Sequence, residues 1–258
     1  MKTIVIKIGG STLGNHDTTL DDLVILQASG LLPVVIHGGG NKITEWLTGL
    51  QIKSEFVGGL RVTNKLTLDV VVAVLCGLIN KELVSSISKL GGKAMGISGI
   101  DGNLIQAAIK QKELGYVGEV VKVNINSVQT IIDAGYIPVI APCAYNIDKD
   151  DPVKLLNING DTAASEIAIA LNADRLIFLT DVDGVRDGTG KILHHLNVKI
   201  ATKLIAEKII DGGMIPKVEA CFKAVNSVKT TQIIDGRKAH ALIHSIENKT
   251  QGTFISND

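Results

Sequence analysis

The stretch "TIVIKIGGST", residues 3–12, joins a strand-like run to a lysine and two glycines. Four β-branched residues precede Lys7, and Gly9 and Gly10 follow Ile8. A continuous apolar run of this kind is typical of a strand that is buried on both faces in a parallel sheet. A lysine near its end either serves a binding site there or extends past the strand into water.

The composition is that of an ordinary globular chain of one or two domains, with 258 residues, 45% of them hydrophobic and 20% charged. The 26 basic residues equal the 26 acidic ones and only 3% are aromatic, so neither a nucleic acid nor an anionic membrane is indicated as a partner. No apolar run reaches the roughly 18 residues that span a bilayer, and the N-terminus carries no signal or transit pattern. The cysteines, Cys76, Cys143 and Cys221, suggest neither a disulfide framework nor a metal pair. We therefore expect a cytoplasmic protein.

Strand-like and helix-like segments alternate along the chain, which predicts βαβ units around a mainly parallel sheet. A weak domain boundary lies at 172–174, where a helix ends in "LNAD" and a new βα unit begins. We expect a functional loop at 145–160, because this stretch is polar between two regular segments. Strands are predicted at 3–8, 32–37, 93–98, 136–142, 175–180, 230–235 and in the final "GTFI", a hairpin at 55–63, a β excursion at 103–124, and helices at 18–30, 41–50, 65–90, 126–135, 161–172, 199–210 and 216–228.

Glycine-containing segments follow three of the predicted strands. They are Gly9 with Gly10, the triple glycine at 38–40, and "TDVDGV" at 180–185. Ligands of open α/β sheets bind beyond the carboxyl ends of the strands, and glycine N–H groups approach an anion closely there. Each segment alone could be an ordinary βα turn, but together they indicate a phosphate site.

The positive charge for such a site must come from lysines, since the sequence has no GxxxxGK[ST] and no GxGxxG after the first strand. Lys7 is one candidate. Lys217 is the second, because Pro216 fits the first turn of a helix and places this lysine near the helix N-terminus. A cation there opposes the helix dipole unless a bound anion compensates it. The alternative is an exposed lysine on a surface helix.

Two further stretches contain polar residues suited to a ligand. In "LNINGDTAA", residues 156–164, Asp161 is either an N-cap or a carboxylate that holds two lysines, and Asn157 and Asn159 project to the same side. In "GGLRVT", residues 58–63, the Arg61 guanidinium suits the recognition of a carboxylate, unless it is a surface arginine of the hairpin.

In combination and in order, these motifs resemble the amino acid kinase family, and within it the acetylglutamate kinases. "GLRVT" with "NINGDTAA" and "GGMIPKV" is a specific combination, whereas "KIGG" or "HGGG" alone would be weak. The resemblance covers residues 7 to about 220. The matching stretches are "KIGGS", "VIHGGGNKI", "GGLRVT", "ISGIDGNLI", "VGEVVKVN", "LNINGDTAA", "LIFLTDVDGV" and "GGMIPKVEA".

The resemblance implies an α/β fold, a three-layer αβα sandwich with a mainly parallel central sheet and two lobes. Residues 1–173 would bind acetylglutamate and form a dimer, and residues 174–258 would bind ATP. The implied reaction transfers the γ-phosphoryl group of ATP to the γ-carboxylate of N-acetyl-L-glutamate and gives N-acetyl-L-glutamyl 5-phosphate, the second step of arginine biosynthesis. Mg²⁺ would be held by ATP phosphates and water, with no metal ligand from the protein.

The resemblance also implies roles for individual residues. Lys7 and Lys217 would stabilise the transferring phosphoryl group, and Asp161 would orient them. A γ-carboxylate is ionised near neutral pH and needs no general base, so His37 is interpreted as a structural residue. The implied substrate-binding residues are Gly39, Gly40, Arg61 and Asn157, and the implied nucleotide-binding residues are Gly9, Gly10, Asp181, Val182, Asp183, Gly184, Ile209, Ile210 and Asp211.

Arginine-inhibited relatives carry an additional N-terminal helix that links dimers into hexamers. Because the first strand begins at residue 3, we expect a homodimer that arginine does not inhibit, with helix 65–90 at its interface. A PII-type regulator is not indicated. Two alternatives stay open: a sister kinase that acts on a carrier-protein-linked aminoadipate or glutamate, and a non-catalytic sensor of nucleotides or amino acids. A sensor should have lost Lys7, Asp161 or Lys217, and all are present.

Overall fold

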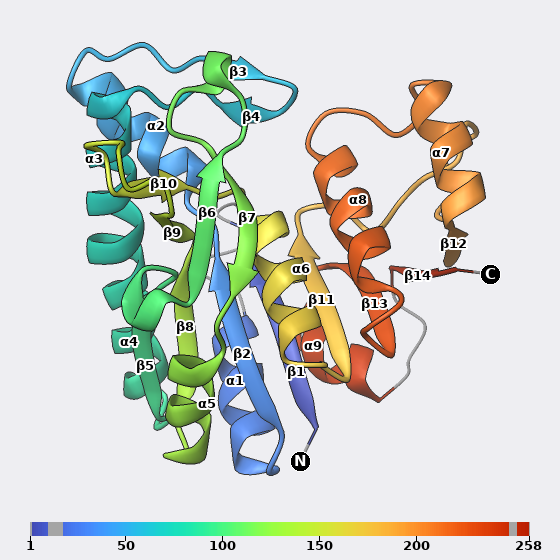
Figure 1. Cartoon of the computed structure of the whole chain (residues 1–258). Coiled ribbons are helices and arrows are strands. Elements are labelled where there is room, and N and C mark those ends of the chain that lie inside the picture. The colour runs from blue at the N-terminus through green and yellow to red at the C-terminus, as the bar shows by residue number, and fades with distance from the viewer. Residues whose placement is uncertain (1, 10–17, 248–251, 258) are drawn as a thin grey trace.

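A computed structural model describes residues 2–9, 18–247 and 252–257 of the chain. Its centre is a sheet in which all neighbouring strands are parallel except β13 and β14 (Figure 1). The strand order is β12 (His195–Asn197), β14 (Thr253–Ser256), β13 (Thr230–Asp235), β11 (Arg175–Thr180), β1 (Thr3–Ile8), β2 (Leu32–His37), β8 (Ile137–Ala141) and β5 (Ala94–Ser98).

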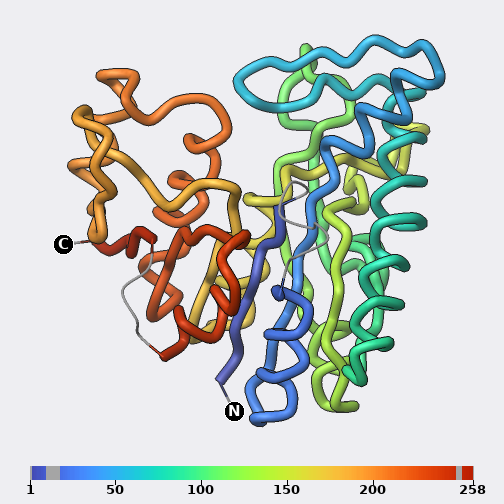
Figure 2. Tube along the Cα trace, turned by 180° about the vertical axis from the view of Figure 1, so that it is seen from behind, coloured from blue at the N-terminus to red at the C-terminus, as the bar shows by residue number. Residues whose placement is uncertain are grey.

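Helices cover both faces of this sheet, because side chains alternate along each strand. In β1, Val5 belongs to the core on one face, and Ile4, Ile6 and Ile8 belong to the core on the other. The fold is therefore the predicted αβα sandwich. The first core contains α5 (Asn126–Asp133), α6 (Gly160–Ala170), α7 (Val198–Ala206) and α8 (Met214–Ala224). The second contains α1 (Thr19–Ala28), α2 (Gly40–Gly49), α9 (Ala241–Ile246) and a long helix at 65–89, which the view from behind shows (Figure 2).

The long helix consists of α3 (Lys65–Val72), a π-helical segment η1 (Ala73–Ile79) and α4 (Asn80–Lys89). It is the one helix of the described residues that is long and apolar enough to cross a membrane by length and composition alone. Core helices of other proteins pass the same test, so the finding is weak evidence for a membrane span. In this structure Val71, Val74 and Ile87 of the helix are fully buried in the second core.

A second sheet and a hairpin lie beside the carboxyl end of the central sheet (Figure 1). Three features of the chain differ from the sequence-based prediction. The predicted loop at 145–160 contains strand residues, and neither β12 nor α9 was expected. The second sheet has the order β10 (Leu155–Asn157), β9 (Cys143–Asn146), β6 (Ile105–Ile109) and β7 (Gly118–Val123); the hairpin is β3 (Phe56–Val57) with β4 (Leu60–Arg61), and the 3₁₀ turns are η2 (Asp101–Asn103) and η3 (Lys112–Leu114).

The position of β1 determines where a ligand can bind. β1 pairs with β2 on one side and with β11 on the other. The helix that follows β1 covers one face of the sheet, whereas α6, which precedes β11, covers the opposite face. The carboxyl end of β1 is therefore a switch point of an α/β sheet, the place where such sheets bind their ligands.

Candidate active site

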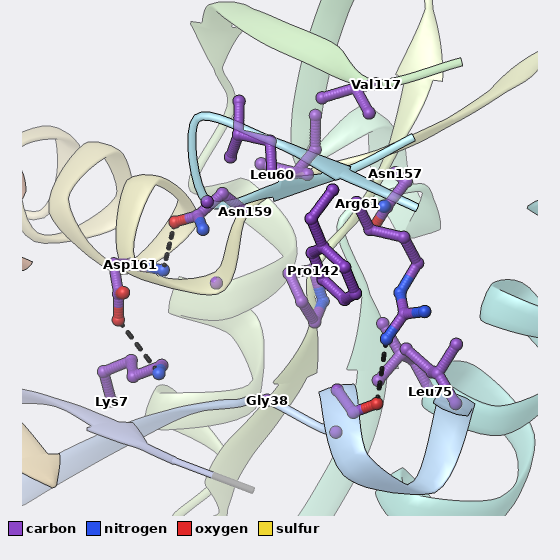
Figure 3. A pocket seen from close by; sticks show the side chains of 17 residues that line it. Lys7, Gly38, Leu60, Arg61, Leu75, Val117, Pro142, Asn157, Asn159 and Asp161 are labelled. Atoms are coloured by element: carbon purple, nitrogen blue, oxygen red, sulfur yellow. Dashed lines mark hydrogen bonds and ion pairs between the residues drawn. The ribbon is translucent and has the colours of Figure 1, made fainter. Parts of the chain in front are cut away.

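A cavity of about 210 Å³ opens at this carboxyl end (Figure 3). It is bounded by Lys7 of β1, the turn at 38–40, the β3–β4 hairpin with Arg61, and the segment 157–161. Four parts of the chain that are distant in sequence thus meet at one site.

Lys7 enters this site because of its place in β1. Lys7 is two residues after Val5 in the same strand, so the two side chains point to the same face of the sheet, which α6 covers. Its Nζ lies 2.9 Å from Asp161 Oδ1, at the start of α6 (Figure 3). Lys7 is buried, and its ammonium group is paired inside the site instead of extending into water.

Asp161 is free to pair with lysines because another residue caps its helix. The N-cap of α6 is Asn159, whose Oδ1 accepts hydrogen bonds from the N–H groups of Asp161 and Thr162. The interpretation of Asp161 as an N-cap is therefore wrong, since an asparagine two residues earlier already fills that position. Burial alone would raise the pKa of the Asp161 carboxyl, but the charges and hydrogen bonds of Lys7 and Lys217 outweigh burial and lower it. Asp161 is therefore ionised at neutral pH.

Lys217 reaches the second oxygen of the same carboxylate. Its Nζ lies 3.1 Å from Asp161 Oδ2 and 3.2 Å from the carbonyl oxygen of Gly213, the N-cap of α8. The helices α6 and α8 are also joined by a hydrogen bond from Ser165 Oγ to the Ala220 carbonyl, 2.8 Å long. Two ammonium groups thus share one buried carboxylate, which leaves one excess positive charge.

Arg61 forms the opposite end of the cavity. Its side chain is only 8% exposed and lies 4.7 Å from the centre of the Phe56 ring. Its guanidinium donates to Ser54 Oγ, Thr44 Oγ1 and the Gly40 carbonyl, and Figure 3 draws the last of these bonds. All of these acceptors are neutral, and burial lowers the pKa of Arg61 without removing its charge. A buried guanidinium whose recorded partners in the described chain are uncharged is suited to bind a ligand carboxylate.

Asn157 and the glycine turn also line the cavity. Asn157 Nδ2 donates to Thr63 Oγ1 at 3.1 Å. Gly39 packs directly on the long helix, since a Cβ at this position would lie 2.4 Å from Ile79 and 2.6 Å from Leu75. Any larger residue here would therefore force the Ile79 and Leu75 side chains to shift.

The residues assigned to the nucleotide lie apart from this lining. Asp181, Val182, Asp183 and Gly184 follow β11, and Ile209, Ile210 and Asp211 lie between α7 and α8. Asp183 forms ion pairs with Arg186 and Lys238, and Gly184 has a φ of 147° beside Thr253. The Gly9 N–H donates to the Leu179 carbonyl at 3.3 Å, and Gly10 lies outside the described residues. The structure thus joins Lys7, Asp161 and Lys217 directly and leaves the nucleotide assignment to be tested.

Sequence reasoning missed several residues of this site. Ser54 and Thr44 hold Arg61, and Leu75 and Pro142 line the cavity. No motif marks them, because the fold alone brings them to the site. In the part of the chain that the structure describes, no group of three His, Cys, Asp or Glu side chains could hold a metal ion.

A mainly parallel αβα sandwich with two lysines on one buried carboxylate, at a switch point of the sheet, defines a site for phosphoryl transfer. The family model of the amino acid kinases matches residues 2–235 of this chain. The chain belongs to the amino acid kinase family and is a phosphotransferase.

Individual relatives agree with this family. The chain is 44% identical to an acetylglutamate kinase of Dehalococcoides mccartyi over 255 residues, which cover 98% of this chain and 94% of the relative. It is 46% identical to the acetylglutamate kinase of Caldanaerobacter subterraneus subsp. tengcongensis, with 100% and 88% covered. Among solved structures, smu.665 from Streptococcus mutans UA159 has a TM-score of 0.86 at 30% identity, with 99% of both chains covered. A carbamate kinase from Giardia lamblia, at a TM-score of 0.70 and 16% identity with 100% and 99% covered, shares the fold.

Proposed function

We propose that the chain transfers the γ-phosphoryl group of ATP to the γ-carboxylate of N-acetyl-L-glutamate and produces N-acetyl-L-glutamyl 5-phosphate. The arrangement of charges in the cavity carries this proposal. Arg61 at one end suits the α-carboxylate of the acceptor. Lys7 lies at the other end, where the γ-carboxylate would meet the phosphoryl group, and its partner Asp161 also holds Lys217. Asn157 lines the same cavity and would offer an amide to the acetyl-amino group.

The residues of the chain would act by position and charge. A γ-carboxylate is already ionised near neutral pH, so no side chain has to remove a proton from it. What opposes the reaction is the repulsion between two anions, and Lys7 and Lys217 would neutralise it. Asp161 would hold both ammonium groups in place, and the N–H groups of Gly39 and Gly40 would add donors from the turn.

ATP and Mg²⁺ fit the chemistry of these donors. Membership of this kinase family implies the use of ATP, and two lysines on one carboxylate leave a positive charge that suits a polyphosphate. Both Asp161 oxygens are engaged by lysines, so we propose that ATP phosphates and water hold Mg²⁺ and that it neutralises charge on the phosphates. We further propose that residues 1–173 bind the acceptor, and that 174–258, with Gly9 and Gly10, bind the nucleotide.

The carrier-linked kinase and the sensor remain the alternatives. The similar curated proteins are named acetylglutamate kinases, and nothing in the comparisons favours a carrier-linked acceptor. A sensor would not need the complete group of Lys7, Asp161 and Lys217 that the site contains.

A hydroxylamine trap tests the reaction directly. The purified chain is mixed with Mg-ATP, hydroxylamine and N-acetyl-L-glutamate, with glutamate and aspartate as controls. We expect hydroxamate from N-acetyl-L-glutamate alone, since only an acyl phosphate reacts in this way. A folded, ATP-binding protein that forms no hydroxamate with any free acceptor would direct the assignment to the carrier-linked kinase.

We also propose that the chain forms a homodimer through the long helix and works in the cytoplasm. Ala73 and Gly77 are exposed on this helix, and small residues allow two helices to approach closely. Sedimentation at micromolar concentration is expected to give a dimer that N-acetyl-L-glutamate and arginine leave unchanged. Replacement of Gly77 by Glu should shift the sedimentation toward the monomer.

A further inference from the structure

The triple glycine turn is held by its carbonyl groups. The Gly38 carbonyl accepts from His37 Nδ1 at 3.0 Å, and the Gly39 carbonyl accepts from the Ile43 N–H at 3.0 Å. The Gly40 carbonyl accepts from Thr44 Oγ1 and from Arg61. Within the described chain, no protein group accepts a hydrogen bond from the Gly39 or Gly40 N–H.

Peptide geometry links these carbonyls to the N–H groups that a ligand would meet. The peptide unit is planar and trans, so the N–H of Gly39 points away from the carbonyl of Gly38 in the same unit. A donor that holds the Gly38 carbonyl therefore also sets the direction of the Gly39 N–H. Glycine has no side chain that would restrict this turn. Without a donor to the Gly38 carbonyl, the peptide unit between Gly38 and Gly39 could therefore rotate.

His37 provides that donor from the opposite side of the sheet. It is the last residue of β2, two residues after Val35, so its side chain points to the same face as Val35, into the second core beside the long helix. The side chain is 0% exposed. Because a carbonyl only accepts, Nδ1 must carry the proton, and Nε2 is left to accept from Asn80 Nδ2 at 3.3 Å. The pKa of the His37 ring is lowered to about 4, mainly because the ring is buried, so the ring is neutral at pH 7.

Asn80 is fixed in the orientation that this hydrogen bond requires. Its Nδ2 also donates to the carbonyls of Val139 and Ile97, at 2.9 and 3.2 Å, so its two hydrogens are shared among three acceptors, of which His37 Nε2 is the most distant. Its Oδ1 accepts from Lys81 Nζ at 3.0 Å. Asn80 begins α4, immediately after the π-helical segment that packs on Gly39. One buried amide therefore ties the long helix to β2, β5 and β8 at the edge where the cavity lies.

We propose that His37 is a positioning residue, oriented by Asn80, that holds the Gly38 carbonyl so that the Gly39 N–H points at the anionic groups bound in the cavity. The inference rests on the proposed function for the identity of those groups. His37 acts through the turn and takes no part in proton transfer. The two hydrogen bonds form a relay: Asn80 donates to the ring of His37, and the ring donates to the Gly38 carbonyl of the turn.

Two substitutions distinguish the hydrogen bond made by Nδ1 from the one made by Nε2. In His37→Asn, the amide nitrogen can occupy the position of Nδ1 and still donate to Gly38. In His37→Gln, the amide oxygen can occupy the position of Nε2 and accept from Asn80, but the Gly38 carbonyl loses its donor. Removing one donor to the transition state lowers kcat by about 10²–10³-fold, and a misdirected donor should cost less. We expect H37Q to lower kcat roughly 10- to 100-fold, H37N to stay within about 3-fold, and the KM for ATP to change by less than about 3-fold in both.

The measurements are hydroxamate initial rates, thermal unfolding, and long-range ¹H–¹⁵N spectra of [¹⁵N]histidine-labelled protein, with His37 assigned by its absence from H37N. The spectrum should show an Nδ1-protonated, neutral ring at pH 7. Equal kcat in H37Q and H37N, a loss of kcat that follows Tm across the two, or a ring protonated at Nε2 would overturn the proposal. If the wild-type protein formed no hydroxamate, the proposed function would fail, and the spectrum alone would support or overturn the relay.

Discussion

Lys7 and Lys217 share the carboxylate of Asp161, and their combined charge exceeds it by one. Opposite charges attract more strongly in a site that excludes water than at a protein surface. A phosphoryl group in transfer carries negative charge on its equatorial oxygens, between an entering and a leaving oxygen. Two ammonium groups on a fixed carboxylate therefore offer this charge a preorganised partner that needs little rearrangement.

Lys217→Ala is expected to lower kcat by roughly 10²-fold or more, the scale for losing one group that stabilises charge in the transition state. The pair of Lys7 and Asp161 remains, so the variant should fold. Hydroxamate initial rates measure the effect. Lys223→Ala is the matched control on the same helix, because Lys223 pairs with Glu166 outside the cavity lining. Turnover of K217A close to that of K223A would remove Lys217 from the mechanism.

The neutral ring of His37 links stability to pH. Its pKa is about 4 in the folded protein, against about 6.5 for an exposed histidine. Between these values the unfolded chain binds more protons than the folded one, so the free energy of unfolding falls as the pH is lowered. From pH 7 to pH 4.5 this histidine should contribute a loss of about 2 kcal/mol. Urea unfolding of wild type and His37→Asn measures it: the variant should lose about 2 kcal/mol less, and identical losses would contradict a buried neutral ring.

At the scale of elements, the start of α6 serves both the fold and the site. Asn159→Ala removes the cap of α6 and should lower the free energy of unfolding by about 1 kcal/mol. Asn197 caps α7 in the same way, by accepting from the Ile200 N–H. Asn197→Ala should therefore lower stability by a similar amount, whereas only N159A should also lower kcat, because α6 positions Asp161. Urea unfolding and initial rates on both variants test this; equal kcat in both would mean that the cap has no role in positioning the carboxylate.

Elements with a long periodic pattern were predictable from the sequence, and so was the short β3–β4 hairpin around its glycine pair, whereas β12 and α9 were not. The apolar run of β1 and the long helix gave clear local signals, and the fold class is confirmed. β12 has three residues and α9 has six, so neither shows a period that local reasoning could detect. The π-helical geometry of η1, whose Leu75 and Ile79 pack against Gly39, has no local sequence signal that we recognised.

The residues of the candidate site also fall into two groups, those that sequence motifs marked and those that only the fold brings together. Motifs marked Lys7, Asp161 and Lys217, and the structure brings them within ion-pair distance. The cap at Asn159 was not recognised, because an aspartate at a helix start resembles a cap equally well. The partners of Arg61 come from α2 and from the segment before β3, and only the folded chain shows that they meet.

Across the whole molecule, Asp161 connects α6 to β1 through Lys7 and to α8 through Lys217. The second link crosses residue 173, where we propose that the two lobes meet. Asp161→Asn keeps the shape of the side chain and removes its charge, which leaves two ammonium groups close together with no anion between them. Removing one member of a buried ionic group typically lowers the free energy of unfolding by about 3–5 kcal/mol.

An added polyanion should recover part of this loss, because it supplies the missing negative charge and binds only the folded state. Thermal unfolding with and without inorganic pyrophosphate measures the recovery, and Tm should rise more for D161N than for the wild type. Asp174→Asn is the control, since Asp174 pairs with the exposed Lys229 away from the cavity. D174N should respond to pyrophosphate as the wild type does. An equal rise in D161N and the wild type would mean that Lys7 and Lys217 do not form the anion site, and the mechanism would then need another source of positive charge.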